Sequence, residues 1–126
     1  MREEAKRVLQ ELKIRIESYT VPVEFLSGGQ RQAIAIGRAI YNKANVLVMD
    51  EPTAALGIEE TRRVGELINQ LKKQDVGIFL ISHDIHDVFD FCDRIAILKN
   101  GEIVEICRST EVTKDDVISM IIKGAR

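Results

Sequence analysis

The 126-residue chain has few of the residues that mark several protein classes. It contains two cysteines, two prolines and no tryptophan, and aromatic residues make up 5% of it. Cys92 and Cys107 form neither a disulfide framework nor a metal-binding pattern, which predicts a reduced cytosolic chain. No apolar run approaches the roughly 18 residues of a membrane span. No cationic start precedes an apolar stretch, so no signal peptide is expected.

An excess of charge of one sign is lacking as well. Eighteen Lys and Arg oppose 20 Asp and Glu, for a net charge of −2. This balance predicts no basic surface for nucleic acid. The hydrophobic content of 45% is too high for a disordered chain. The length suits one ordinary domain of about 100–200 residues, and leaves little room for a large nucleotide-binding enzyme.

Helical and strand-like segments alternate along the chain. Apolar residues at intervals of three and four predict helices over residues 3–14, 28–43, 58–74 and 85–92, with a loop around 18–25. The inner face expected for the helix 58–74 consists of Val64, Leu67, Ile68 and Leu71. Apolar runs predict strands at 46–49, 78–81, 95–98 and 103–106. Asn100-Gly101 predicts a hairpin turn because both of its positions favour positive φ. A last helix is expected from Thr113, with Asp116 three residues on in a capping-box arrangement.

This order predicts an α/β fold. Short all-apolar strands between helices are typical of a mainly parallel sheet covered on both faces. The antiparallel hairpin 95–106 is expected at one edge of that sheet. Ligands bind beyond the carboxyl ends of the strands in such sheets. The residues that follow 46–49 and 78–81 are therefore the first candidates for a functional site.

The second predicted helix begins at a polar, glycine-containing string, Leu26-Ser27-Gly28-Gly29-Gln30. Ser27 as N-cap and Gln30 at position N3 fit a capping box. The capping box leaves the two glycines unexplained, since each costs up to about 1 kcal/mol relative to alanine in a helix. A bound phosphate would explain them, because it needs close access to backbone N–H groups at the positive end of a helix. The residues alone leave both interpretations open.

Ionisable residues follow both apolar runs that predict buried strands. Asp50 and Glu51 follow 46–49, and His83 lies just beyond 78–81. Adjacent strand residues point to opposite sides. One carboxylate can therefore hold Mg²⁺ while the other orients or deprotonates a water molecule. The alternative is that the carboxylates only cap the following turn and that His83 is structural.

In combination these strings resemble the ATP-binding-cassette (ABC) ATPase family over about residues 20–110. The motifs that carry the resemblance are the signature motif at Leu26–Gln30, Walker B with its adjacent catalytic glutamate at Val46–Glu51, the D-loop at Ala54–Gly57 and the switch histidine at His83. The resemblance implies part of a P-loop NTPase-type fold, corresponding to the C-terminal half of an ATPase domain. Residues 1–43 would then belong to the helical signature subdomain and 44–126 to the distal α/β core.

The resemblance also implies a role for each motif. Ser27, Gly28, Gly29 and Gln30 would contact the γ-phosphate of ATP bound to an opposing subunit. Asp50 would support Mg²⁺, Glu51 would be the general base, and His83 would contact the γ-phosphate and stabilise the transition state.

The implied cofactors are ATP and Mg²⁺. The implied partners are a second ATPase subunit, identical or different, and transmembrane permease subunits at the cytoplasmic face of the cell membrane. Ala54-Ala55-Leu56-Gly57 and the stretch 82–98 resemble the simple-sugar importer branch, which implies carbohydrate uptake.

Two features depart from the family pattern. Gly57 stands where the D-loop usually ends in aspartate, so no carboxylate is available there for contacts across subunits. No run of the form G-x-x-x-x-G-K-[ST], which cradles phosphates, occurs in the 126 residues. The adenine-stacking aromatic residue and the glutamine loop also have no counterpart. The chain alone is therefore expected to hydrolyse almost no ATP.

Other functions remain as alternatives. The chain could be a non-catalytic interaction module that lends its signature motif to a partner's ATP. A relation to the chromosome-maintenance branch is less favoured, because no heptad run is present. Half of a sheet should leave an exposed strand edge and an uncovered apolar face, which predicts self-association.

Overall fold

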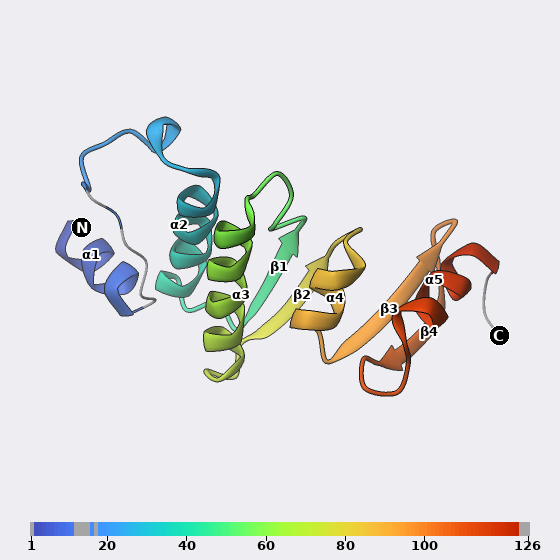
Figure 1. The fold of residues 1–126 in the computed structure, drawn as a ribbon. Coiled ribbons are helices and arrows are strands. Elements are labelled where there is room, and N and C mark those ends of the chain that lie inside the picture. Colours follow the sequence, from blue (N-terminus) through green and yellow to red (C-terminus); the bar gives the residue numbers. More distant parts are fainter. Residues whose placement is uncertain (1, 12–15, 17, 124–126) are drawn as a thin grey trace. The chain divides into compact units, whose positions relative to one another are not determined.

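The computed structural model describes residues 2–11, 16 and 18–123, in two compact units, Met1–Ile81 and Ser82–Arg126. Figure 1 shows the order of their elements. The first unit contains α1 (Arg2–Glu11), the 3₁₀ turn η1 (Val23–Phe25), α2 (Gly28–Tyr41), β1 (Val46–Asp50), α3 (Ile58–Lys72) and β2 (Gly77–Ile81). The second contains α4 (Ile85–Phe91), β3 (Arg94–Lys99), β4 (Glu102–Arg108) and α5 (Lys114–Lys123). The α/β class is confirmed.

In the first unit, β1 and β2 form a parallel pair in which Asp50 lies opposite Ile81. The carboxyl ends of the two strands therefore meet at the same edge, as expected. α2 and α3 pack side by side. The inner face predicted for α3 is confirmed by four buried side chains, Val64, Leu67, Ile68 and Leu71. The spacing of these four residues places their side chains on one face of α3, where they form the core of the unit.

The two faces of the parallel pair differ. Within the described residues one face is uncovered, as expected for half of a sheet, and the prediction of a sheet covered on both faces is wrong. Leu47 and Met49 are buried, whereas Val48 and its partner Phe79 are each 69% exposed. Side chains of a strand alternate between faces. A run can therefore be apolar throughout although the described elements cover only one of its faces.

In the second unit, β3 and β4 form the predicted antiparallel hairpin. Asn100 and Gly101 have φ of 52° and 84°, which confirms the expected turn. The core of this unit consists of Ile95 and Ile97 of β3 together with Val117 and Met120 of α5.

Within the second unit, the hairpin forms a two-stranded antiparallel sheet. The turn aligns both strands locally, and α5 covers their apolar side, so the hairpin needs no third strand to be formed.

The predicted start of the last helix is confirmed. The backbone N–H of Thr113 donates to Asp116 Oδ2 at 2.9 Å, and the N–H of Asp116 donates to Thr113 Oγ1 at 3.2 Å. These reciprocal bonds are the two halves of a capping box. Of the helices in the described part of the chain, none is both long and apolar enough to cross a bilayer.

Candidate functional site

The signature-like string forms the start of α2. The N–H of Gln30 donates to Ser27 Oγ at 3.2 Å, and the N–H of Ser27 donates to Gln30 Oε1 at 3.0 Å. The capping box predicted from the sequence is therefore confirmed. It orders the loop that precedes the helix and holds the string in one conformation.

The two glycines allow another part of the chain to approach the start of α2 closely. A Cβ added to Gly28 would lie 2.7 Å from Leu56 Cδ2, and one added to Gly29 would lie 3.1 Å from the Cβ of Glu60. The first contact could be relieved by moving the end of a leucine side chain, whereas the second involves an atom next to the backbone of α3. Other groups therefore do lie close to the backbone of the two glycines. They belong to the turn before α3 and to the first turn of α3.

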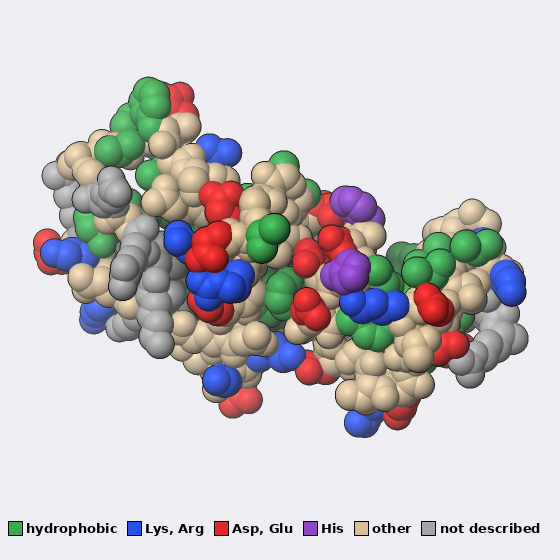
Figure 2. Space-filling model, in the orientation of Figure 1, with side chains coloured by type: hydrophobic (Ala, Val, Ile, Leu, Met, Phe, Trp, Pro, Cys, Tyr) green, Lys and Arg blue, Asp and Glu red, His purple; other side chains and the backbone are tan. Residues whose placement is uncertain are grey.

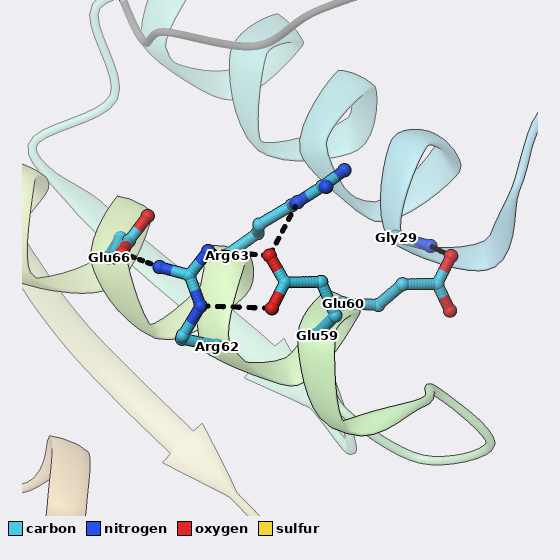
Figure 3. A network of polar contacts seen from close by, with 6 residues as sticks. All are labelled: Gly29, Glu59, Glu60, Arg62, Arg63 and Glu66. Carbon is cyan, nitrogen blue, oxygen red and sulfur yellow. Dashed lines mark hydrogen bonds and ion pairs between the residues drawn. The ribbon is translucent and has the colours of Figure 1, made fainter.

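Glu60 links the starts of α2 and α3 (Figure 3). Its Oε1 accepts the N–H of Gly29 at 3.4 Å, and its Oε2 accepts the N–H of Gly57 at 3.3 Å. Hydrogen bonds from the Ser27 hydroxyl, and from the N–H groups of Gly57 and Gly29, hold the pKa of Glu60 below its usual range. The carboxylate is therefore the charged form at neutral pH.

The sequence does not predict this role of Glu60. By residue type and position, Glu59 and Glu60 are alike, since both are acidic residues at the positive end of a predicted helix. The available signal was the position of Glu60 three residues after the N-cap, Gly57, where a carboxylate turns back toward the cap. The contact with Gly29, 31 positions away, had no signal in the sequence.

Asp50 and Glu51 lie at the carboxyl end of β1 in different backbone conformations. Asp50 is the last residue of the strand and is exposed. Glu51 follows in the left-handed region with φ of 47°, and its N–H donates to the carbonyl oxygen of Ile81 at 2.8 Å. Glu51 therefore does not follow the alternation of side chains along β1, because it lies beyond the strand and the turn sets its direction.

The left-handed conformation of Glu51 is strained. It costs a residue with a Cβ about 1–2 kcal/mol, and such residues persist where the surrounding structure holds them. Here the hydrogen bond to Ile81 anchors the amide side of Glu51 to β2. Strained positions cluster at functional sites, which favours a use for this carboxylate beyond capping.

The turn from Glu51 to α3 contains a second strained residue, and it is not the glycine. Ala55 has φ of 60°, whereas Gly57 has φ of −71°, and a Cβ added to Gly57 would meet nothing within 4 Å. Neither the backbone conformation nor the local space requires glycine at position 57. On its own, the string Ala54-Ala55-Leu56-Gly57 predicts a turn with a conformationally permissive glycine. The prediction for the glycine is therefore wrong.

His83 lies in the second unit, two residues beyond the end of β2, and is exposed. The neighbouring polar residues start α4, because Asp84 Oδ1 accepts the N–H of His86 at 2.8 Å. The structure thus joins the Ser27–Gln30 string to the turn before α3 and places Asp50 and Glu51 at the shared end of β1 and β2. It places His83 in the other unit.

Comparisons with known proteins agree with these features. A family model described as ABC transporter matches residues 1–54. The chain is 42% identical over 125 residues to the xylose/arabinose import ATP-binding protein XylG of Sulfolobus acidocaldarius, covering 99% of this chain and 50% of that protein. It is 40% identical over 122 residues to the fructose import ATP-binding protein FrcA of Rhizobium meliloti, covering 96% of this chain and 47% of FrcA.

Solved structures show the same fold. A nucleotide-free ATP-binding cassette from an ABC transporter superimposes with a TM-score of 0.79 at 27% identity, covering 96% of this chain and 48% of that one. A dimeric bacterial ABC transporter cassette superimposes with a TM-score of 0.72 at 28% identity, covering 86% and 47%.

These likenesses define the class of protein as an α/β ATPase cassette of the P-loop NTPase fold. Within that class, the chain belongs to the ABC transporter ATPase family, and its sequence resembles the sugar-import proteins XylG and FrcA. The chain spans about half the length of these two curated relatives.

Proposed function

We propose that the chain is the C-terminal half of an ABC transporter ATP-binding subunit that couples ATP binding and hydrolysis to carbohydrate import. One observation carries the proposal: a capped, glycine-containing signature string and a strained carboxylate at a strand end are built into a single compact unit. The sugar-import names of the relatives support the choice of substrate class.

The proposal assigns a role to each residue of the string at the start of α2. Ser27, Gly28, Gly29 and Gln30 contact the γ-phosphate of ATP held by a second subunit. Backbone N–H groups at the positive end of a helix favour such an anion. The serine hydroxyl and the glutamine amide add donors to those of the backbone.

The remaining roles are assigned to the residues beyond the strands. Asp50 presents one exposed carboxylate, which fits Mg²⁺, an ion commonly held by one or two carboxylates together with nucleotide phosphates. Bound Mg²⁺ would supply positive charge to the phosphates. Glu51 orients and deprotonates the attacking water, and His83 contacts the γ-phosphate and stabilises the transition state.

The proposed partners are a second ATP-binding subunit and transmembrane permease subunits, with the chain bound at the cytoplasmic face of the membrane. A dimeric cassette among the solved structures supports the first of these. The alternative function is a non-catalytic module that lends its signature string to a partner's nucleotide. The ordered capping box at Ser27 supports both, because it preforms the string within this chain alone.

The first prediction concerns catalysis by the chain alone. ATP turnover by the purified 126-residue chain should equal that of its Glu51→Gln variant, because no G-x-x-x-x-G-K-[ST] loop is present to hold the phosphates. A coupled assay of ADP release with Mg²⁺ measures both proteins side by side. Turnover by the wild-type chain well above that of Glu51→Gln would contradict the proposal that it is only half of a catalytic unit.

The second prediction concerns self-association through the uncovered face of the β1–β2 pair. Val48 and Phe79 are each 69% exposed on it, and exposed apolar strands invite pairing with another chain. Light scattering at high concentration should show species larger than a monomer, and Val48→Lys should reduce them. Ile58→Lys is the matched control, since Ile58 is 94% exposed but lies on α3. A monomeric wild-type chain, or an equal effect of both variants, would count against this surface.

A further inference from the structure

The carboxylate of Glu60 binds the same polar groups that would contact a phosphate in the proposed function. Its Oε1 accepts the N–H of Gly29 at 3.4 Å, and the hydroxyl of Ser27 donates to the same carboxylate. Figure 3 shows the Glu60 side chain extending from α3 across to the first turn of α2. An anion of the chain itself therefore occupies this end of the helix.

A carboxylate and a phosphoryl group bind to the same kinds of hydrogen-bond donor. Both are anionic acceptors that bind best to N–H and O–H donors at the positive end of a helix. The O–H of Ser27 and the N–H of Gly29 cannot donate fully to a carboxylate and a phosphate at the same time. Two anions that share these donors would also repel each other. The two anions therefore compete for the start of α2.

We propose that Glu60 is an internal competitor, which holds the signature string when no phosphate is engaged and is displaced when the γ-phosphate of a partner's ATP arrives. This inference rests on the proposed function, because it assumes that Ser27 and Gly29 meet a phosphate. It makes Glu60 a regulatory residue and gives the resting string a defined conformation.

The surroundings of Glu60 allow this displacement without a backbone movement. The Cβ of Glu60 lies only 3.1 Å from the position that a Gly29 Cβ would take, so the start of α3 is held close to α2. The carboxylate can turn away about its own side-chain bonds. Its Oε2 already accepts the N–H of Gly57 at 3.3 Å. That bond lies within the first turn of α3 and can persist after the contact with Gly29 breaks.

The neighbouring Glu59 offers a matched control. The contacts of its carboxylate are with residues of α3 itself: it accepts from Arg62 Nε at 3.1 Å, with Arg63 Nε 3.5 Å away. Arg62 also pairs with Glu66, one turn further along α3. Figure 3 shows these acidic and basic side chains on α3, and Figure 2 shows that acidic and basic side chains alternate over this region of the surface. Glu59→Gln removes the same charge one residue away and leaves the start of α2 untouched.

The experiment mixes the chain with a complete sugar-import ATP-binding subunit whose catalytic glutamate is replaced by glutamine. Association is measured by light scattering over a range of Mg·ATP concentrations. Glu60→Gln keeps the size of the side chain and removes its charge. It should lower the ATP concentration for half-maximal association by about fivefold or more, the range of coupled binding events. Glu59→Gln should match the wild type.

The outcomes separate this inference from the proposed function. If the wild-type chain associates and Glu60→Gln needs as much ATP or more, the competitor role is overturned and the proposed function stands. If only Glu60→Gln associates, both are supported.

If no variant associates, the proposed function fails and the competitor role is decided on the free chain. Tripolyphosphate should then shift the Gly29 amide signal in NMR spectra at lower concentration for Glu60→Gln than for wild type. Equal midpoints, or no shift, would overturn it.

Discussion

Replacing Ser27 by arginine is expected to abolish ATP-dependent association of this chain with a complete ATP-binding subunit. The substitution removes the hydroxyl that accepts from Gln30 at 3.2 Å. It also places a long side chain over Gly28 and Gly29, where the proposed function needs bare backbone. The loss should amount to about 100-fold or more in affinity, equivalent to about 2.7 kcal/mol. Light scattering of the two proteins with Mg·ATP measures it.

A second variant separates the surface from the helix cap. Ser27→Ala also loses the N-cap, at a cost of about 0.5–2 kcal/mol in folding free energy, but it leaves the approach to the glycines open. Association should therefore be weakened by Ser27→Ala and abolished by Ser27→Arg. Thermal unfolding of both variants reports the shared loss of the cap. Association of Ser27→Arg at the wild-type ATP concentration would refute a role of this surface in trans.

Replacing Leu71 by alanine is expected to destabilise the first unit by about 2–5 kcal/mol. Leu71 is 0% exposed and is one of the two largest fully buried side chains among the described residues. Removing it leaves a cavity that the surrounding side chains fill only in part. Such a loss is large beside the total stability of about 5–15 kcal/mol that is usual for a domain. Denaturant unfolding followed by circular dichroism measures it.

The matched control for Leu71→Ala is Ile58→Ala on the same helix. Ile58 is 94% exposed, and substitutions at exposed positions usually change stability by less than about 0.5 kcal/mol. The two variants delete apolar groups of the same size from one helix at opposite extremes of burial. Equal unfolding midpoints for the two would show that α3 does not pack as the structure places it.

The elements that could be predicted are those whose signals are local. The apolar stripe of α3 identified Val64 and Leu71 as buried, and the Asn100-Gly101 pair identified the hairpin turn. The capping boxes at Ser27 and Thr113 were also readable, because each is completed within four consecutive residues. In all these cases the residues that interact are neighbours in the chain, so their spacing carries the information.

The elements that could not be predicted depend on residues far apart in the chain. Whether Val48 is buried depends on which elements cover its face of the β1–β2 pair, and no property of the apolar run 46–49 tells one face from the other. The strained conformation of Glu51 depends on its bond to Ile81. Ala55, not Gly57, adopts the other left-handed conformation of the turn.

The sequence by itself determined the order of the helices and strands, the motifs that mark an ABC ATPase and the absence of a phosphate-cradling loop from these residues, because each is a matter of residue type and spacing. Only the tertiary structure decided what approaches the two glycines at the start of α2. Leu56 and Glu60 reach them from a segment about 30 positions further along the chain. Packing of α3 against α2 brings the Glu60 carboxylate to the Gly29 N–H, and no local pattern encodes that contact between distant residues.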